Sequence, residues 1–283
     1  MTLPTQVGVY GGGRMGAGIA HAFLVAEAHV TVIESSTESA DTARERIETS
    51  LARAAERGHL AEGAPSAVAR LAVSTEPAQL SGCGLVVEAV PEQVALKRQV
   101  LAAIEVAAPG AWVATNTSSL SVDELASTLA RPERFIGLHF FNPVPASRLV
   151  EIVVGAKTVP ELVDLSRGWI ADLGKTAITV TDSPGFASSR LGVAIALEAM
   201  RMLEEGVATA EDIDTAMELG YKHPVGPLRT TDLVGLDVRL AIAEHLAREV
   251  GERFAPPSIL RELVAVGHLG RKSGQGFYSW PPA

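Results

Sequence analysis

A glycine-rich turn between a strand pattern and a helix pattern constrains this chain more than any other feature. Residues 6–10 (QVGVY) have the apolar character of a buried parallel strand, residues 11–16 (GGGRMG) follow at once, and a helical pattern begins directly afterwards. In such a turn Gly11 permits the sharp bend, Gly13 lets the backbone approach a pyrophosphate, and Gly16 lets the helix pack on the strand. The arrangement predicts a dinucleotide-binding α/β domain.

The residue that ends the second predicted strand indicates which dinucleotide is bound. The strand pattern at 29–33 (HVTVI) leads into Glu34, whose carboxylate can accept hydrogen bonds from both ribose hydroxyls and would repel a 2′-phosphate. Ser35 and Ser36 follow and provide no arginine for such a phosphate. We therefore expect NAD rather than NADP as the cofactor.

Strand and helix patterns alternate along the first two thirds of the chain and then stop alternating. Strand patterns occur at 6–10, 29–33, 71–74, 85–90, 112–115, 135–139, 149–154 and 176–181. Beyond the break at 182–185 (DSPG), helical patterns follow at 187–205, 210–219, 236–250 and 259–266. The sequence thus predicts an α/β fold, with a doubly wound, mainly parallel sheet in residues 1–182 and an all-α domain in residues 183–283. The helix at 187–205 is apolar on nearly every side, so we expect it to be sandwiched, with a subunit interface as one option.

The composition excludes several classes of function. The chain has 283 residues, of which 47% are hydrophobic and 20% charged, and no apolar run approaches the roughly eighteen residues that span a bilayer. A net charge of -9 argues against nucleic acid and anionic membranes as partners. The single cysteine, Cys83, has no metal-ligand spacing around it, and the N-terminus has no signal-peptide pattern. We expect small-molecule partners, no metal, and a cytoplasmic location.

Polar side chains stand where two of the predicted strands end. Residues 116–119 (NTSS) follow the strand pattern at 112–115, and His139 ends the pattern at 135–139. Doubly wound folds bind ligands at the carboxyl ends of their parallel strands. Ser118 and His139 are therefore expected to project into one cleft.

Burying the carboxylate of Glu151 costs free energy, because this residue lies inside an apolar strand pattern (LVEIVV) at 149–154. A carboxylate buried there needs a partner, and His139, twelve residues upstream, is the candidate. A histidine titrates near neutral pH, so a His139–Glu151 pair suits general acid–base chemistry. A purely structural pair that holds two strands together remains an alternative on these grounds.

The helical pattern at 37–61 is polar and carries Arg44, Arg46, Arg53 and Arg57. These arginines fit a solvated face and a phosphate-binding face equally well. No comparable motif surrounds the other histidines or several lysines. We therefore assign no site role to His21, His29, His59, His223, His245 and His268, and we expect surface positions for Lys157, Lys175 and Lys222.

Longer motifs resemble those of a known family. They are VYGGGRMGAGIA at 9–20, VVEAVPE at 86–92, TNTSSL at 115–120, GLHFFNPVP at 137–145, LVEIV at 149–153, DSPGF at 182–186, EDIDTAMELG at 211–220, HPVGPL at 223–228 and GRKSGQGFY at 270–278. In combination they resemble the short-form L-3-hydroxyacyl-CoA dehydrogenases of the 3-hydroxybutyryl-CoA dehydrogenase group over essentially the whole length. The resemblance implies a Rossmann-type NAD-binding domain, a helical substrate and dimerisation domain, a homodimer, and an acyl-CoA substrate in the cleft between the domains.

The resemblance also assigns roles to single positions. His139 corresponds to the family's catalytic histidine, Glu151 to its partner, and Ser118 to the serine that meets the substrate oxygen. The positions that would contact NAD are Gly11, Gly12, Gly13, Arg14, Met15, Gly16, Glu34, Glu92, Lys97, Ser118, Asn142 and Lys272. Ser50 and Arg57, together with Ser118, correspond to positions that hold the CoA substrate.

Ser189 is the main departure from the family pattern. The family usually has an asparagine at this position, near the nicotinamide and the substrate, and the resemblance therefore makes Ser189 a further catalytic-site residue. Serine can donate and accept a hydrogen bond as asparagine does, but its reach is shorter. We expect the substrate side of the site to differ accordingly. Gln93, where asparagine is common, is a smaller change.

The implied reaction interconverts an L-3-hydroxyacyl-CoA and a 3-oxoacyl-CoA. In the oxidation, His139 takes the proton of the 3-hydroxyl as hydride moves to NAD, Glu151 fixes the imidazole tautomer, and Ser118 hydrogen-bonds the developing oxyanion. A dehydrogenase of free acids with a catalytic lysine is disfavoured, because residues 191–202 contain no lysine. A dehydrogenase of acyl-carrier-protein thioesters and a catalytically weak structural or binding relative remain as alternatives.

Overall fold

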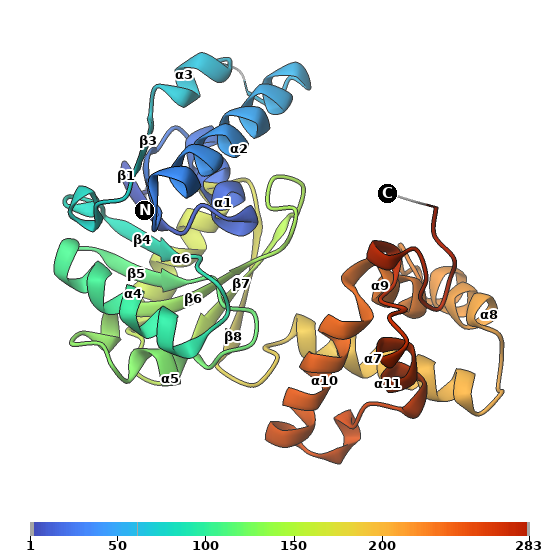
Figure 1. Cartoon of the computed structure of the whole chain (residues 1–283). Coiled ribbons are helices and arrows are strands. Elements are labelled where there is room, and N and C mark those ends of the chain that lie inside the picture. The colour runs from blue at the N-terminus through green and yellow to red at the C-terminus, as the bar shows by residue number, and fades with distance from the viewer. Residues whose placement is uncertain (1–2, 61, 282–283) are drawn as a thin grey trace. The chain divides into compact units, whose positions relative to one another are not determined.

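The first of two compact units in the chain is built on one sheet. A computed structural model describes residues 3–60 and 62–281, and the described chain divides into units Met1–Ser183 and Pro184–Ala283. Within the first unit the described residues form an eight-stranded sheet of order β3-β2-β1-β4-β5-β6-β7-β8 (Figure 1). The strands are β1 Gln6–Tyr10, β2 His29–Ile33, β3 Leu71–Ser74, β4 Leu85–Glu88, β5 Trp112–Thr115, β6 Phe135–Phe140, β7 Leu149–Val154 and β8 Thr176–Thr181.

The pairing of these strands confirms the mainly parallel, doubly wound sheet. Strands β1 to β6 pair in parallel, β7 runs antiparallel to β6, and β8 is parallel to β7. The valines of β1 and β2 are buried, as are the residues of α1 from Gly16 to Leu24, because helices cover both faces of the sheet. The strands β1 to β6 therefore present their carboxyl ends at one edge of the sheet, where polar side chains can gather.

Helices alternate with the strands of the first unit. They are α1 Arg14–Val25, α2 Thr37–Glu56, α3 Ala64–Val68, α4 Val94–Ala107, α5 Val122–Ala126 and α6 Pro160–Asp172, with short 3₁₀ turns η1 Pro77–Leu80 and η2 Pro132–Arg134. The prediction of a single helix over residues 37–61 is wrong at its C-terminal end, because α2 ends at Glu56. Gly58 and Gly63 have φ of 71° and 81°, which a continuing helix does not allow, and residue 61 lies outside the described residues.

The second unit is helical, as predicted. Its elements are α7 Ser188–Glu204, α8 Ala210–Thr215, the π-helical turn η3 Ala216–Gly220, α9 Pro227–Val234, α10 Leu236–Val250, η4 Glu252–Phe254, α11 Ser258–Ala265 and η5 Arg271–Ser273. Helix α9 was not predicted, although its sequence has a start signal in Pro227 and a stop signal in Gly235, whose φ is 107°.

Helix α7 packs one face into the core of the second unit, and the expectation that it is sandwiched, with a subunit interface as one option, stays a prediction. Val193, Leu197 and Met200 are buried in the core of the second unit, whereas Leu191 is 64% exposed and Ile195 37% exposed in the described chain. One face of α7 is therefore core and the opposite face is a partly apolar surface. Among the described residues, no helix combines the length and the apolar character needed to cross a membrane.

Candidate functional site

His139 and Glu151 are direct cross-strand neighbours. The antiparallel register of β6 and β7 places His139 opposite Glu151, and His139 Nδ1 lies 2.7 Å from Glu151 Oε2. Glu151 is 0% and His139 7% exposed, and the ring of Phe141 packs against the imidazole with centroids 4.5 Å apart. An ionised carboxylate can only accept, so the Nδ1 atom carries the proton and the lone pair of the neutral ring lies on Nε2.

A buried ionic network lies beside this pair at the ends of β4 and β5. Lys97 of α4 is 1% exposed, and its Nζ donates to Glu88 Oε1 at 2.7 Å and to the Val90 carbonyl at 3.1 Å. The same Nζ lies 3.3 Å from Glu92 Oε2, and Thr115 Oγ1 donates to Glu88 Oε2 at 2.6 Å. Lys97 Nζ thus makes two hydrogen bonds and a further ion pair within the chain, and Lys97 can act on a ligand through Glu92.

Glu92 organises the loop that follows β5. Its Oε1 accepts from Thr117 Oγ1 at 2.7 Å, from the backbone amides of Ser118 at 2.8 Å and Ser119 at 3.0 Å, and from Ser118 Oγ at 3.3 Å. Burial on its own would raise the pKa of Glu92, but Lys97 and these hydrogen bonds outweigh burial and lower that pKa. Glu92 is therefore held as an anion that positions Ser118.

A pocket of about 490 Å³ brings many of the sequence-predicted residues together. It is lined by residues that include Gly13, Arg14, Met15, Glu92, Ser118, His139 and Asn142. Asn116 also lines it, and its Oδ1 accepts from the Phe140 amide at 2.9 Å, which joins the ends of β5 and β6. Asn116, Glu88 and Thr115 had no predicted role. The burial argument that singled out Glu151 applies equally to Glu88 in its apolar strand.

The glycine loop has the shape that a dinucleotide requires. Gly11 has φ of 97°, and a Cβ at Gly16 would overlap the Gly11 carbonyl oxygen, so both positions need glycine. A Cβ at Gly13 would meet no described atom within 4 Å, which leaves the backbone open to a phosphate. No side chain caps the N-terminus of α1 among the described residues. The residues present therefore fit NAD.

Glu34 lies next to this loop. Its Oε1 accepts from the Gly12 amide at 2.5 Å, and its Oε2 from the Ser35 amide at 3.3 Å. Arg46 of α2 donates to the Gly12 carbonyl at 3.0 Å from the other side. The loop is thus held between an acidic and a basic side chain.

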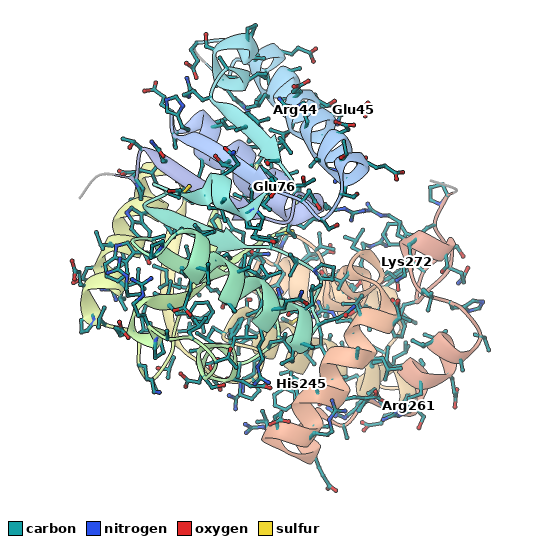
Figure 2. The ribbon with its side chains drawn as sticks, turned by 60° about the vertical axis from the view of Figure 1, so that its left-hand side comes forward. Arg44, Glu45, Glu76, His245, Arg261 and Lys272 are labelled. Carbon is teal, nitrogen blue, oxygen red and sulfur yellow. The ribbon has the colours of Figure 1, made fainter. Side chains whose placement is uncertain are left out.

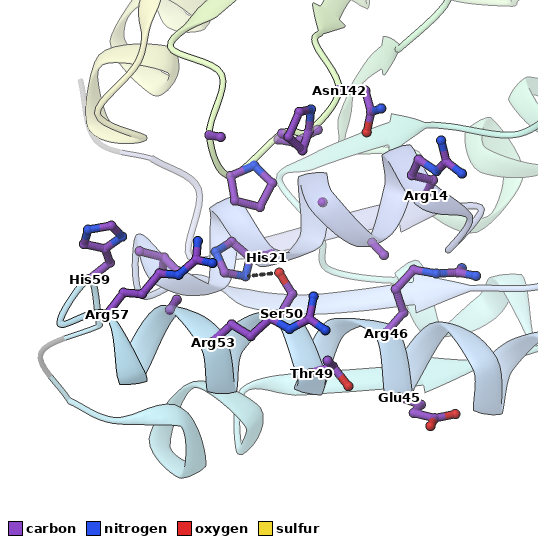
Figure 3. Close-up of a pocket in the computed structure, with 18 of the residues that line it drawn as sticks. Arg14, His21, Glu45, Arg46, Thr49, Ser50, Arg53, Arg57, His59 and Asn142 are labelled. Atoms are coloured by element: carbon purple, nitrogen blue, oxygen red, sulfur yellow. Dashed lines mark hydrogen bonds between the residues drawn. The ribbon is translucent and has the colours of Figure 1, made fainter. Parts of the chain in front are cut away.

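A second pocket, of about 750 Å³, is basic. It lies between α2 and residues 142–146. The side chains of Arg46 and Arg53 of α2, and of Arg57 at its C-terminal end, extend toward it, with Arg14 across from them (Figure 3). Ser50 also lines it. Arg44, labelled on α2 in Figure 2, does not line the pocket. It pairs instead with Glu48 at 3.6 Å.

His21 and Lys175, which the sequence gave no role, are both connected with this pocket: His21 lines it, and Lys175 binds the backbone next to residues 144–146, which also line it. His21 is 5% exposed, lines the pocket, and its Nδ1 lies 3.0 Å from Ser50 Oγ (Figure 3). Burial and the nearby charge of Lys175 lower the pKa of His21 to about 4. Lys175 is half-buried rather than on the surface, and its Nζ donates to the carbonyls of Val144 at 2.7 Å and Ser147 at 2.6 Å. The surface assignment of Lys175 is wrong because these carbonyls need a donor.

The remaining predicted residues lie in the second unit. Ser189 is half-buried in the first turn of α7. Lys272 lies in η5, and its Nζ forms an ion pair with both carboxylate oxygens of Asp237 at 2.6 Å. Burial on its own would raise the pKa of Asp237, but Lys272 and backbone hydrogen bonds lower it.

Two family models match the chain in sequence. The one described as "3-hydroxyacyl-CoA dehydrogenase, NAD binding domain" matches residues 6–183, and the one described as "3-hydroxyacyl-CoA dehydrogenase, C-terminal domain" matches residues 185–280. Together they cover almost all of the chain.

Curated proteins and solved structures of similar length match as well. The chain is 40% identical over 280 residues to a 3-hydroxybutyryl-CoA dehydrogenase of Mycobacterium tuberculosis, covering 97% of this chain and 98% of that protein. It is 38% identical over 277 residues to a probable 3-hydroxybutyryl-CoA dehydrogenase of Deinococcus radiodurans, covering 97% and 100%. The crystal structure of (S)-3-hydroxybutyryl-CoA dehydrogenase from Ralstonia eutropha matches with a TM-score of 0.94 and 38% identity, covering 99% of this chain and 100% of that one.

Proposed function

The chain belongs to the 3-hydroxyacyl-CoA dehydrogenase family of NAD-dependent oxidoreductases, and from this premise we propose that it interconverts an L-3-hydroxyacyl-CoA and a 3-oxoacyl-CoA, with 3-hydroxybutyryl-CoA and acetoacetyl-CoA as the first pair to test. The observation that carries the proposal is the buried His139–Glu151 pair. Its imidazole lines the same pocket as Gly13 and Met15 of the dinucleotide loop. A proton-transfer group therefore stands beside the place where a dinucleotide would bind.

His139 performs the proton transfer in this proposal. When bound, NAD supplies the hydride acceptor for the oxidation and the hydride donor, as NADH, for the reduction. The Nε2 lone pair of His139 takes the proton of the 3-hydroxyl, and Glu151 holds the proton on Nδ1 and stabilises the imidazolium. In the reduction, the imidazolium returns that proton to the 3-oxygen. Because Glu151 is fully buried and on the neighbouring strand, it sets the tautomer without reaching the substrate.

In this proposal the residues around His139 bind and orient the substrate and NAD. Glu92 fixes the loop that carries Ser118, so that the Ser118 hydroxyl can donate to the substrate oxygen as negative charge develops there. Lys97 holds Glu92 through an ion pair, so it acts as a positioning residue and does not itself contact the substrate or NAD. Asn142 lines both pockets. Glu34 and the glycine loop hold the adenosine side of NAD.

The basic pocket holds the phosphates of CoA in this proposal. Arg53 and Arg57 provide guanidinium groups that phosphate oxygens prefer, and Ser50 provides a hydroxyl. The helical unit contributes Ser189 and Lys272 on the family resemblance. We also propose a homodimer formed through that unit, supported by its exposed apolar side chains such as Leu191 and Leu219, at 64% and 69% exposed. A cytoplasmic location agrees with the buried single thiol of Cys83.

The experiment that tests the proposal follows NADH absorbance at 340 nm with acetoacetyl-CoA as substrate. The unmodified enzyme is expected to oxidise NADH, and His139→Ala and Glu151→Gln are expected to lose about 10²- to 10⁴-fold in kcat, because general acid–base catalysis contributes that much. NADH affinity, measured by fluorescence titration, should stay within a few-fold. His29→Ala, at the exposed start of β2, is the matched control. No turnover by the unmodified enzyme with any acyl-CoA, or a normal rate in His139→Ala, would contradict the proposal.

A further inference from the structure

His21 of α1 is a buried histidine in the wall of the basic pocket, and the proposed proton transfer does not use it. It is 5% exposed and lines this pocket together with Ser50 of α2 (Figure 3). Its Nδ1 lies 3.0 Å from Ser50 Oγ, and among the described residues this is the only hydrogen bond of the imidazole. The ring thus has one partner, which is a hydroxyl group at a pocket.

The pocket lies between one face of α1 and one face of α2, which pack on each other. The residues of α1 that line it are spaced as residues on one helical face are: Arg14, Ala17, Gly18, His21 and Val25. The lining residues of α2 and its C-terminal end repeat this spacing: Thr42, Glu45, Arg46, Thr49, Ser50, Arg53, Ala54 and Arg57. His21 and Ser50 are therefore held toward each other by the packing of two helices.

The charge of the pocket is positive, but His21 does not contribute to it. Four arginines and one acidic residue, Glu45, line the pocket among the described residues, and neither Arg53 nor Arg57 forms an ion pair within the described chain. Burial, together with the charge of Lys175, lowers the pKa of His21 to about 4. Near pH 7 the imidazole is neutral, so it can act on a ligand only through its hydrogen bonds.

The hydrogen bond between His21 and Ser50 has two possible directions, and an anion allows only one of them. A hydroxyl has one hydrogen to donate, and a neutral imidazole has one N–H and one lone pair. If Ser50 donates its hydrogen to a phosphate oxygen, an unprotonated Nδ1 would face the hydroxyl oxygen with its lone pair. The contact at 3.0 Å is then a hydrogen bond only when Nδ1 carries the proton.

We propose that His21 is a positioning residue for the phosphates of the CoA substrate: its Nδ1–H donates to Ser50 Oγ, so that the Ser50 hydroxyl donates to a phosphate oxygen. Hydrogen bonds in such a chain polarise one another, so the imidazole makes the hydroxyl a better donor. This inference rests on the proposed function, because it concerns the CoA portion of the same substrate. The neighbouring guanidinium groups supply the charge, and His21 supplies the direction of the Ser50 hydroxyl.

The alternative is a pair that only ties α1 to α2. Ser50 would then donate to His21 Nδ1, and the imidazole would carry its proton on Nε2. The two roles place the same proton on different nitrogen atoms of His21. They also differ in what a substitution changes, because a structural pair affects the free energy of unfolding, whereas a positioning pair affects the affinity for phosphates.

The first test reads the tautomer of His21 in the full-length enzyme by nuclear magnetic resonance with ¹⁵N-labelled histidine at pH 7. The probe is adenosine 3′,5′-bisphosphate, a phosphorylated fragment of CoA, and the spectrum of His21→Asn identifies the His21 signals. In the bound state we expect a neutral ring with the proton on Nδ1. A proton on Nε2, or an imidazolium ion, in the bound state would overturn the inference.

The second test measures the affinity for the same probe by calorimetry. His21→Leu is expected to weaken binding by about 3- to 10-fold, the effect of one hydrogen bond, and Ser50→Ala by a similar factor. The double variant should bind no more weakly than Ser50→Ala, because both substitutions remove one chain of hydrogen bonds. His21→Asn, whose amide can donate to Ser50, should restore most of the affinity. His29→Ala, at the exposed start of β2, is the control.

Kinetics complete the test and separate it from the proposed function. In His21→Leu the KM for acetoacetyl-CoA should rise by the same factor as the probe's dissociation constant, while kcat and the KM for acetoacetyl-pantetheine stay unchanged. Independent, additive losses in His21→Leu and Ser50→Ala, or unchanged affinity in His21→Leu, would overturn the inference even if the enzyme is active. Conversely, absent turnover of every acyl-CoA would overturn the proposed function, while the tautomer and the affinities still decide the role of His21.

Discussion

The burial of charge shapes the site residue by residue. Glu88, Lys97, His139 and Glu151 are between 0% and 7% exposed, and each has a charged or hydrogen-bonding partner at 2.7 Å. Removing a charge from water costs several kcal/mol, so each of these residues requires a partner placed within hydrogen-bond distance. The residues that carry the proposed chemistry are therefore also the residues whose geometry the fold controls most tightly.

His21 makes a testable contribution to stability against pH. Burial, together with the charge of Lys175, lowers its pKa in the folded protein to about 4, from an ordinary value of 6.5. Between these pH values the unfolded chain binds more protons than the folded one, so the free energy of unfolding falls as pH drops from 6.5 toward 4. At pH 5 this loss is about 2 kcal/mol relative to pH 7. His21→Gln should remove it, as measured by urea unfolding at pH 7 and pH 5.

A control separates titration from hydrogen bonding. Ser50→Ala removes the partner of His21 Nδ1 but leaves the buried imidazole in place, so it should keep most of the pH dependence. If His21→Gln and the unmodified protein lose the same free energy between pH 7 and pH 5, His21 is not the group responsible.

At the scale of elements, the turn between β1 and α1 offers a matched pair of glycine substitutions. Gly16→Ala places a Cβ against the Gly11 carbonyl oxygen, so α1 must shift, and we expect the free energy of unfolding to fall by about 1–3 kcal/mol. Gly13→Ala meets no described atom, so it should cost less than about 1 kcal/mol. It should nevertheless weaken NADH binding by about tenfold or more, because it blocks the approach of the pyrophosphate.

Urea unfolding and fluorescence titration with NADH check both variants of this turn. Equal stability of Gly16→Ala and the unmodified protein would contradict the packing argument. Unchanged NADH affinity in Gly13→Ala would contradict the assignment of the loop to the dinucleotide.

The junction of β4, α4 and β5 depends on one ammonium group. Lys97→Met leaves Glu88 buried without a counter-charge, and we expect a loss of about 3–5 kcal/mol in the free energy of unfolding. The double variant Glu88→Gln with Lys97→Met removes both charges and should recover part of that loss. Denaturant unfolding of the two single variants and the double variant measures the coupling. If Lys97→Met lowers the free energy of unfolding by less than about 1 kcal/mol, the stability of the fold does not depend on the ion pair between Lys97 and Glu88.

At the scale of the whole molecule, the net charge and the local charge have opposite signs. The chain carries -9 overall, yet Arg14, Arg46, Arg53 and Arg57 line one pocket. Arg57→Gln should raise the KM for acetoacetyl-CoA by about 3- to 10-fold, and the effect should shrink at high salt. The KM for acetoacetyl-pantetheine, which lacks the nucleotide phosphates, should not change. Arg44→Gln on the same helix is the control, and an equal effect of both substitutions would argue against a phosphate site.

Sequence patterns were most informative where a local physical cost decides the structure. The strands β1, β2, β3, β5, β7 and β8 were predicted with the bounds that the structure has, because short apolar runs between breakers have few alternatives. Helix ends were less certain. Helix α2 ends before its predicted end, and 210–219 is an α-helix followed by a π-helical turn, because glycine conformations and tertiary packing decide where the hydrogen-bond ladder stops.

The amino-acid sequence by itself determined the glycine turn between β1 and α1, the acidic residue Glu34 at the end of β2, the mainly parallel sheet, and the need for a partner at Glu151. These are local consequences of backbone freedom and of the cost of burying charge. Only the tertiary structure decided which side chains are in contact when their residues lie far apart in the sequence. It placed Lys97 between Glu88 and Glu92, His21 beside Ser50, and Lys175 beside the carbonyls of Val144 and Ser147. The reason is physical: burial and contacts between distant residues arise from packing, and no local pattern encodes the distance between two side chains.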